Sequence, residues 1–346
     1  MSGTINSDRC EHGLRNEARE AEQCVLWRLI RGRDSRRHSV SRVIVAHADW
    51  GVDPHKQWVA VAKQDARGRW SASAPRPAQQ FGSLRDRLYV DGAAKTAVLG
   101  FDFPIGIPRA YADSAGVTHF LDLLSECGEG VWRDFFEVAD APNEISLHRP
   151  FYPRTFLPKG AKRQAYLTEA LGLEFKLLRR RCEKSQPGRR AACPLFWTCG
   201  PNQVGKGALT GWRLFKEEVA GDTWYWPFDG SLACLSDRPG TVVVETYPAE
   251  FYGHLGMDTV VNKGDQMVRR CCGGALLAIA QDLDVRLDRE LETNITDGFR
   301  SGDDAFDAVV GLFGILNVLF GRRAEGIPDD RAVREVEGWM LGQAAP

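Results

Sequence analysis

From Arg42 on, the chain alternates short apolar runs with turn residues. The runs are continuous and rich in Val, Ile and Ala, which is typical of strands that are buried on both faces. Gly and Pro residues separate one run from the next. The five runs of this kind are residues 43–46, 58–62, 70–74, 96–103 and 241–245. The pattern predicts five strands, and the first three form a meander.

Helical spacing of apolar residues occurs between and after these runs. Asp265 precedes one such segment and is a suitable N-cap for it. The segments predicted to be helical are residues 81–89, 117–124, 162–181, 265–279 and 303–320. The resulting order is three strands, a helix, a strand, a long interval, a strand and two helices. This order predicts an α/β fold with a mixed sheet that is covered by helices.

The chain divides into three parts on composition. Residues 1–38 are polar and aperiodic, and we expect a flexible tail or extension. Residues 39–346 form the predicted α/β domain. Within that domain, residues 109–238 lie between the fourth and fifth strands, and their mixture of helical spacing with Pro, Trp and Gly predicts a mostly helical insertion.

The charge of the chain is unevenly distributed, although the net charge is only -1. Residues 149–190 hold twelve Lys and Arg against three acids, whereas residues 281–346 hold fourteen acids against seven bases. A basic insertion beside an acidic core suits a protein that binds a polyanion such as DNA or RNA. Two ordinarily solvated surfaces are the alternative interpretation.

The nine cysteines show no Cys-x-x-Cys pair, which favours reduced, mostly buried thiols. The longest apolar stretch, residues 308–320, is shorter than the roughly 20 residues that a membrane span needs. The start of the chain shows no secretory pattern. These features predict a cytoplasmic protein with no membrane partner.

Carboxylates end three of the apolar runs. Asp49 follows the first strand, Asp102 lies between two phenylalanines in the fourth, and Glu245 closes the fifth. An isolated charge at such a buried place costs several kcal/mol or becomes protonated. Sites in α/β sheets assemble at strand ends, so these three acids are candidate functional residues.

The last predicted helix contributes two further acids. Asp304 and Asp307 are three residues apart and share one helix face, while Gly311 and Gly314 continue close to that face and permit a close approach to another backbone. Clustered carboxylates repel one another, and a divalent cation removes that repulsion. Hard oxygen ligands favour Mg²⁺ or Mn²⁺, as one ion or two.

Each of these acids also has a purely structural interpretation. Asp49 can cap the turn that follows it, and Asp303 or Asp304 can cap the last helix. Glu245 can pair with an arginine. The metal interpretation gains its weight from the four places taken together.

Several blocks of the sequence resemble an uncharacterised family of predicted nucleases, catalogued as a domain of unknown function with a ribonuclease-H-like fold. The blocks are Asp49, Gly-Phe-Asp-Phe-Pro-Ile-Gly-Ile-Pro at 100–108, 203–213, Val-Glu-Thr-Tyr-Pro-Ala-Glu at 244–250, Asp-Asp-Ala-Phe-Asp-Ala at 303–308, and 337–342. Asp304 and Asp307 also resemble the final acidic pair of Holliday-junction resolvases. The resemblance covers about residues 42–342.

The resemblance implies a ribonuclease-H-like fold and a two-metal phosphodiesterase site. Its metal ligands would be Asp49, Asp102, Asp304 and Asp307, with Glu245 close by as a further catalytic residue. One ion would activate a water and the other would stabilise the leaving oxygen. The chain departs from resolvases and ribonuclease H at Asp102, where those proteins more often carry the longer Glu.

Basic residues provide candidate phosphate contacts. They are Lys56, Arg179, Arg180, Arg181, Lys206 and Arg213. Residues 200–207 imitate a phosphate-binding P-loop, but Gly207 stands where Ser or Thr is needed to hold Mg²⁺, so a substrate-facing loop or a structural turn is the better interpretation.

Two other functions stay open on the sequence. A nucleic-acid-binding module can keep the fold and the acids without catalysis. Asp49-Trp-Gly51 followed by Lys56 is similar to the first phosphate loop of actin-like and sugar-kinase phosphotransferases, but the second Asp-x-Gly loop of those proteins is not found.

Overall fold

The computed structural model describes residues 42–78, 94–153, 163–186, 189–199, 204–218, 222–257 and 262–345. All of them belong to one compact unit, Ser41–Pro346. The tail predicted for residues 1–38 and the helix predicted for residues 81–89 lie outside the described residues.

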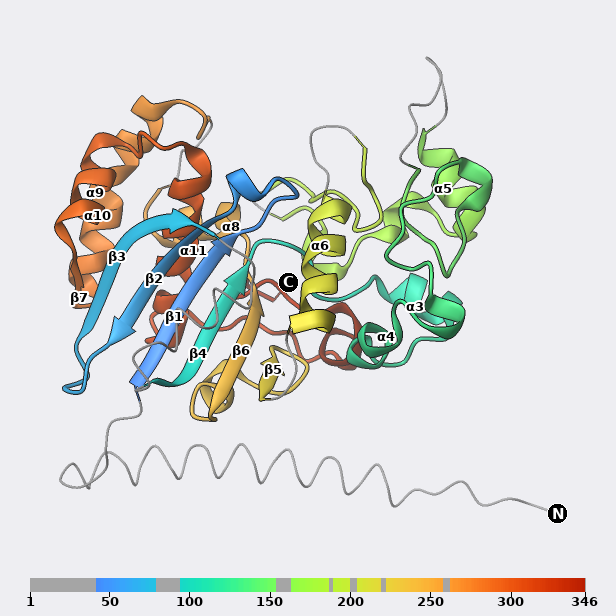
Figure 1. Cartoon of the computed structure of the whole chain (residues 1–346), viewed down its shortest axis with the longest axis horizontal. Coiled ribbons are helices and arrows are strands. Elements are labelled where there is room, and N and C mark those ends of the chain that lie inside the picture. Colours follow the sequence, from blue (N-terminus) through green and yellow to red (C-terminus); the bar gives the residue numbers. More distant parts are fainter. Residues whose placement is uncertain are drawn as a thin grey trace. The chain divides into compact units, whose positions relative to one another are not determined.

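A mixed seven-stranded sheet forms the centre of this unit, in the order β5-β6-β4-β1-β2-β3-β7 (Figure 1). The strands are β1 Arg42–Asp49, β2 Trp58–Gln64, β3 Trp70–Pro77, β4 Ala94–Phe101, β5 Thr223–Tyr225, β6 Gly240–Glu245 and β7 Val285–Leu287. β2 runs antiparallel to β1 and β3, and the other neighbouring pairs are parallel. The α/β class and the five predicted strands are confirmed. β5 and β7 were missed because they have only three residues each.

Helices cover both faces of the sheet. They are α3 Arg109–Ala115, α4 Phe120–Glu126, α5 Arg163–Leu171, α6 Val204–Glu218, α7 Leu232–Leu235, α8 Pro248–His254, α9 Gln266–Asp282, α10 Arg289–Asp297 and α11 Asp303–Leu319, with a π-helix at Val333–Glu337. α11 packs across β1 and β2, and α8 and α9 pack against α11. α6 and the insertion lie on the other side of β4 and β6 in the view of Figure 1.

Glycines allow α11 to lie close to the sheet and to α8. A Cβ at Gly311 would stand 2.3 Å from the ring of His47 in β1, and one at Gly314 would stand 2.2 Å from the ring of Phe251 in α8. The predicted close approach is therefore present, but it is made to side chains rather than to a backbone. His47 is fully buried, and burial lowers its pKa to about 3, so the ring against Gly311 is neutral.

The insertion between β4 and β6 is less helical than its sequence predicted. The helix expected over 162–181 ends at Leu171, and two short 3-10 turns, Phe175–Leu178 and Arg181–Glu183, follow it. Residues 204–218 form the helix α6, so the loop or turn predicted for residues 200–207 is wrong for 204–207. Lys206 and Arg213 therefore lie on a helix. The insertion also contributes β5, which pairs with β6.

The cysteines differ from the sequence expectation at one residue. Cys234 is disulfide-bonded, so the prediction of uniformly reduced thiols is wrong there. Six other cysteines of the described part form no disulfide: Cys127, Cys182, Cys193, Cys199, Cys271 and Cys272. Within the same residues, no helix combines the length and the apolar character needed to cross a bilayer.

Candidate functional site

Four of the five candidate acids meet where β1 and β4 end beneath the start of α11. Asp49 is the last residue of β1, and Asp102 directly follows β4, which is the parallel neighbour of β1 with Ala48 opposite Phe101. Asp304 and Asp307 lie in the first two turns of α11. Parallel strands end at the same edge of a sheet, and this edge carries the acids. We call Asp49, Asp102, Asp304 and Asp307 the acidic cluster.

The acids of the cluster interact electrostatically. Burial raises the pKa of Asp49 most, followed by the charge of Asp102, a hydrogen bond with Asp102, and the charges of Asp307 and Asp304. Burial also raises the pKa of Asp102, while the hydrogen bonds from Asp49 and from the Trp50 N–H, 2.7 Å from Asp102 Oδ1, lower it. Burial and the charge of Asp102 therefore disfavour the ionised form of the Asp49 carboxyl.

Two residues that the sequence did not single out bind the helix side of the cluster. The Tyr252 hydroxyl in α8 donates to Asp307 Oδ1 at 2.7 Å, and the Lys263 ammonium contacts Asp307 Oδ2. Lys263 Nζ also lies 4.0 Å from Asp303 Oδ2. Burial raises the pKa of Asp307, and the hydrogen bonds from Lys263 and Tyr252 oppose this rise. Neither residue lies in a pattern that marks a site.

The acidic cluster has the type of ligand that a divalent cation prefers, but its side chains are not arranged to coordinate one. Carboxylate oxygens are the ligands that Mg²⁺ and Mn²⁺ prefer, and the carboxyl groups of Asp49 and Asp102 are buried beside the more open Asp304. The charge of Asp102 raises the pKa of Asp49, and a divalent cation beside the two carboxyl groups would relieve this repulsion. However, no three His, Cys, Asp or Glu side chains among the described residues are placed to hold a metal ion as they stand.

Glu245 does not belong to the acidic cluster, contrary to the sequence prediction. Its carboxylate pairs with the fully buried Arg180, with Nη2 2.6 Å from Oε1 and Nη1 2.7 Å from Oε2. The Ile105 N–H donates to the same Oε2 at 2.6 Å. Side chains alternate along a strand. Glu245 therefore points to the same face of the sheet as Val243, which packs with the insertion. Asp49 points to the opposite face, which α11 covers. The structural interpretation, a pair with an arginine, is the one that is observed.

The basic residues of the insertion are largely engaged within the protein. Arg180 is fully buried, so its predicted contact with substrate is wrong. Arg181 Nη1 pairs with Asp330 at 2.8 Å, and Arg213 Nη2 pairs with Glu137 at 2.6 Å. Arg179 donates from Nε to the Ala192 carbonyl at 2.8 Å and lies over the ring of Phe175. The positive surplus of the insertion thus goes partly into internal ion pairs.

Lys56 and Lys206 are better placed for a phosphate beside the acids. Lys56 is exposed at the end of a 3-10 turn, Pro54–Lys56, and its charge opposes the rise in the pKa of Asp304 that burial and Asp303 cause. Lys206 lies in the first turn of α6, where a Cβ at Gly207 would be 3.7 Å from the Trp50 carbonyl oxygen. This end of α6 is therefore near the backbone that follows Asp49.

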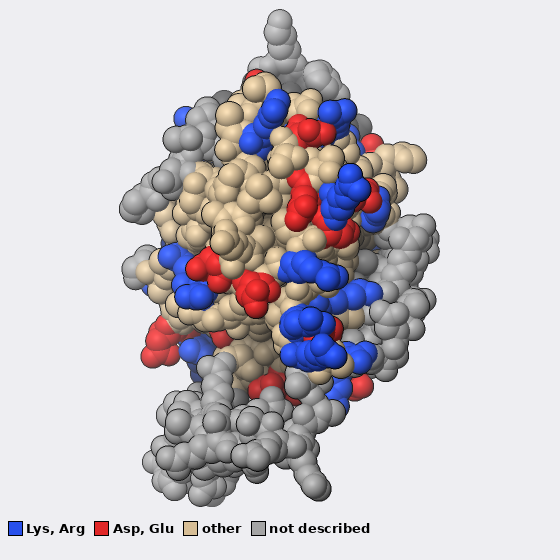
Figure 2. Space-filling view, turned by 90° about the vertical axis from the view of Figure 1, so that its left-hand side faces the viewer, with Lys and Arg blue, Asp and Glu red and all other residues tan. Residues whose placement is uncertain are grey.

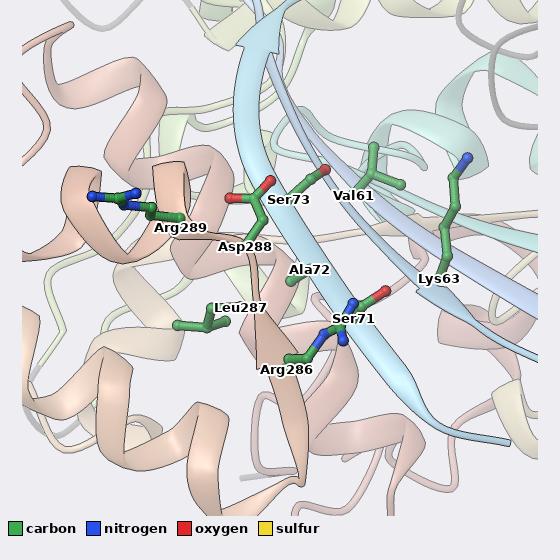
Figure 3. Close-up of a pocket in the computed structure, with 9 residues that line it drawn as sticks. All are labelled: Val61, Lys63, Ser71, Ala72, Ser73, Arg286, Leu287, Asp288 and Arg289. Atoms are coloured by element: carbon green, nitrogen blue, oxygen red, sulfur yellow. The ribbon is translucent and has the colours of Figure 1, made fainter.

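A separate groove of about 520 Å³ lies along β2, β3 and β7. Lys63, Arg286 and Arg289 are among its lining residues, but Figure 3 shows Arg289 directed away from the other two. Ala60 and Ala62 of β2 pack in the core with α11. By alternation, Val61 and Lys63 of the groove are then on the opposite face from Asp49. Lys and Arg side chains gather on this side of the molecule with acidic ones among them (Figure 2). The groove is therefore not the approach to the acidic cluster.

No protein-family model, curated protein or solved structure matches the chain. The fold and the site therefore define the protein only by class, as an α/β protein with a mixed seven-stranded sheet and an acidic cluster at the ends of two parallel strands.

Asp49→Asn is expected to raise the stability of the metal-free protein at neutral pH. The folded state holds the Asp49 proton more tightly than the unfolded chain, so this carboxyl lowers stability as pH rises from about 4 through its raised folded-state pKa. Asn removes the charge, and its amide can still donate to Asp102. Thermal denaturation between pH 4 and pH 8 without divalent ions should show a higher melting temperature at the upper end and a flatter pH profile.

Asp65→Asn is the control for this measurement, because its sign is opposite. Hydrogen bonds from the Arg69 backbone and side chain lower the pKa of Asp65 to about 2, so its charged form is favoured by folding. Its replacement should lower stability slightly above pH 4. An Asp49→Asn protein that melts below the wild type at pH 8 would show that the cluster is not under charge repulsion.

Proposed function

We propose that the protein is a divalent-metal-dependent nuclease built on a ribonuclease-H-like core. The observation that carries the proposal is the placement of Asp49 and Asp102 at the ends of adjacent parallel strands, with Asp304 and Asp307 of α11 close enough for their charges to raise the pKa of Asp49. Carboxylates kept together at such a strand end are costly without a cation. A function that uses the cation explains why they are there.

The sheet topology supports the ribonuclease-H-like core. The meander of β1, β2 and β3 is extended on the far side of β1 by the parallel strands β4 and β6, and α11 packs across β1 and β2. β5 and β7 add one short strand at each edge. This arrangement fits the mixed sheet covered by helices that the resemblance implies.

The proposed chemistry is hydrolysis of a phosphodiester bond in DNA or RNA. Asp49, Asp102 and Asp304 would hold the Mg²⁺ or Mn²⁺. Asp307 would not, since Tyr252 and Lys263 already engage both of its oxygens. A bound ion of this kind lowers the pKa of a coordinated water and stabilises charge on a phosphoryl oxygen. Lys56 and Lys206 would neutralise the phosphates on either side of the scissile bond, and Tyr252 keeps Asp307 oriented.

The direct test is cleavage of a panel of single-stranded, duplex and branched DNA and RNA. We expect cleavage in Mn²⁺ or Mg²⁺ that leaves a 5′-phosphate and a 3′-hydroxyl, and little or none in EDTA or in Ca²⁺, whose looser coordination holds the reacting oxygens poorly. Binding of the panel without cleavage would favour the non-catalytic module. ATP hydrolysis that depends on Asp49, with nucleic acid intact, would favour the phosphotransferase.

A further inference from the structure

Lys263 places a positive charge beside the acidic cluster. We call the acidic cluster together with Lys263 and Asp303 the acidic centre. The Lys263 ammonium contacts Asp307 and lies 4.0 Å from Asp303 Oδ2. Burial lowers the pKa of Lys263, but the charges of Asp307, Asp49 and Asp303 and the hydrogen bond to Asp307 outweigh burial and raise it. Its charge opposes the raised pKa of Asp102 and of Asp304 as well. Lys263 therefore acts on both sides of the centre.

A buried arginine fixes the backbone of Lys263. Arg269 in α9 donates from Nη1 to the Lys263 carbonyl at 2.5 Å. The same guanidinium donates from Nε to Gly298 at 3.0 Å and from Nη2 to Phe299 at 3.1 Å, just before α11. Hydrogen bonds from a charged group are stronger than neutral ones. Lys263 is thus anchored to the segment that leads into the helix carrying Asp307.

The centre consists of two unequal halves. On the helix half, both oxygens of Asp307 are engaged, Oδ1 by Tyr252 and Oδ2 by Lys263. On the strand half, Asp49 ends β1 and Asp102 directly follows β4, the parallel neighbour of β1, and the Trp50 N–H donates to Asp102 Oδ1 at 2.7 Å. A divalent ion bound on this half gains two carboxylate ligands without displacing an ammonium. A second ion at Asp307 would have to displace an ammonium that is already in contact there.

We propose that the centre takes a single divalent ion, held on the side of Asp49 and Asp102, and that the ammonium of Lys263 takes the place of a second ion beside Asp307. This inference rests on the proposed metal-dependent function. It replaces the two-ion site that the sequence resemblance implies. The ammonium supplies one fixed positive charge without metal, and its repulsion opposes a second ion nearby.

The test is the stoichiometry of Mn²⁺ binding to the full chain, measured by calorimetry and by the loss of free Mn²⁺ signal in electron paramagnetic resonance. The wild type should bind one ion in the centre. Lys263→Met, which keeps the length of the side chain and removes its charge, should bind a second ion, and Mn²⁺ should raise its melting temperature more than that of the wild type. Lys263→Arg keeps the charge and should still bind one ion.

Lys216→Met is the matched control. This lysine also makes an ion pair, with Glu129 at 2.9 Å, and it donates to the Cys127 carbonyl at 2.5 Å, but it belongs to α6 near α4. Its replacement should leave the stoichiometry at one. Two ions in the wild type, or one ion in a folded Lys263→Met, would overturn the inference while metal-dependent cleavage still stands. No Mn²⁺ bound by either protein would overturn both the inference and the proposed function.

Discussion

Arg180→Met is expected to lower the free energy of unfolding by about 3–5 kcal/mol, the cost of removing one partner of a buried ion pair. Arg180 is fully buried and pairs with Glu183 at 2.8 Å and with Glu245 at 2.6 Å, and its Nη1 also donates to the Glu337 carbonyl at 3.0 Å. Methionine fills most of the volume but leaves two buried carboxylates without their cation. Urea denaturation at neutral pH measures the difference.

Two comparisons separate this effect from a loss of packing. Adding Glu245→Gln to Arg180→Met removes one of the two buried carboxylate charges that have lost their partner. The double variant should therefore regain part of the lost stability. Arg181→Met removes the neighbouring arginine, whose pair with Asp330 is about one-third exposed, and should cost only about 0–1 kcal/mol. Equal losses for Arg180→Met and Arg181→Met would mean that burial of the network is not what stabilises this part of the fold.

The sequence indicated Asp49 and Asp102 because it placed a carboxyl group at the end of an apolar strand. The pattern indicates a site because a buried charge is costly unless another group compensates it. β1 and β4 are parallel neighbours, so the two strand ends lie at the same edge of the sheet. Asp304 and Asp307 followed from helical spacing, which places residues three apart on one face. Local periodicity was sufficient for these four residues because each element was read correctly.

Glu245 shows the limit of the same reasoning. It ends an apolar strand as Asp49 does, but strands alternate their side chains, and the face that a given residue takes depends on the register of the sheet. The pairing of Glu245 with Arg180, 65 residues earlier, is a tertiary contact between segments that carry no shared motif. The charge surplus of the insertion gave no indication that part of it is used internally.

The glycines near the start of α6 show a different limit. Residues 200–207 imitate a phosphate loop and were predicted to form a substrate-facing loop or a turn, but Gly205 and Gly211 allow close packing of the helix α6. A Cβ at Gly205 would stand 2.5 Å from the Leu195 carbonyl oxygen, and one at Gly211 would stand 2.1 Å from the ring of Phe103. A glycine needed for close packing and a glycine needed for a turn look the same in one sequence. Lys263 was missed because only the folded chain brings it to Asp307.

Asp102→Asn is expected to reduce nucleic-acid cleavage by on the order of 10³-fold, or about 4 kcal/mol of transition-state stabilisation. The amide oxygen of Asn can still accept the Trp50 N–H that Asp102 Oδ1 accepts at 2.7 Å, so the local backbone should be preserved. What is lost is the negative charge that an ion requires. Single-turnover cleavage at saturating nucleic acid measures the chemical step, and binding of the nucleic acid should persist.

Asp229→Asn is the control that makes this loss specific. Asp229 also accepts a backbone N–H at 2.7 Å, from Tyr225, and burial raises its pKa, but it lies beside β5 at the far edge of the sheet. Its replacement changes the same charge in a similar setting and should leave cleavage within about threefold of the wild type, because it holds no ion. If both variants cleave equally well, the carboxyl of Asp102 does not serve catalysis.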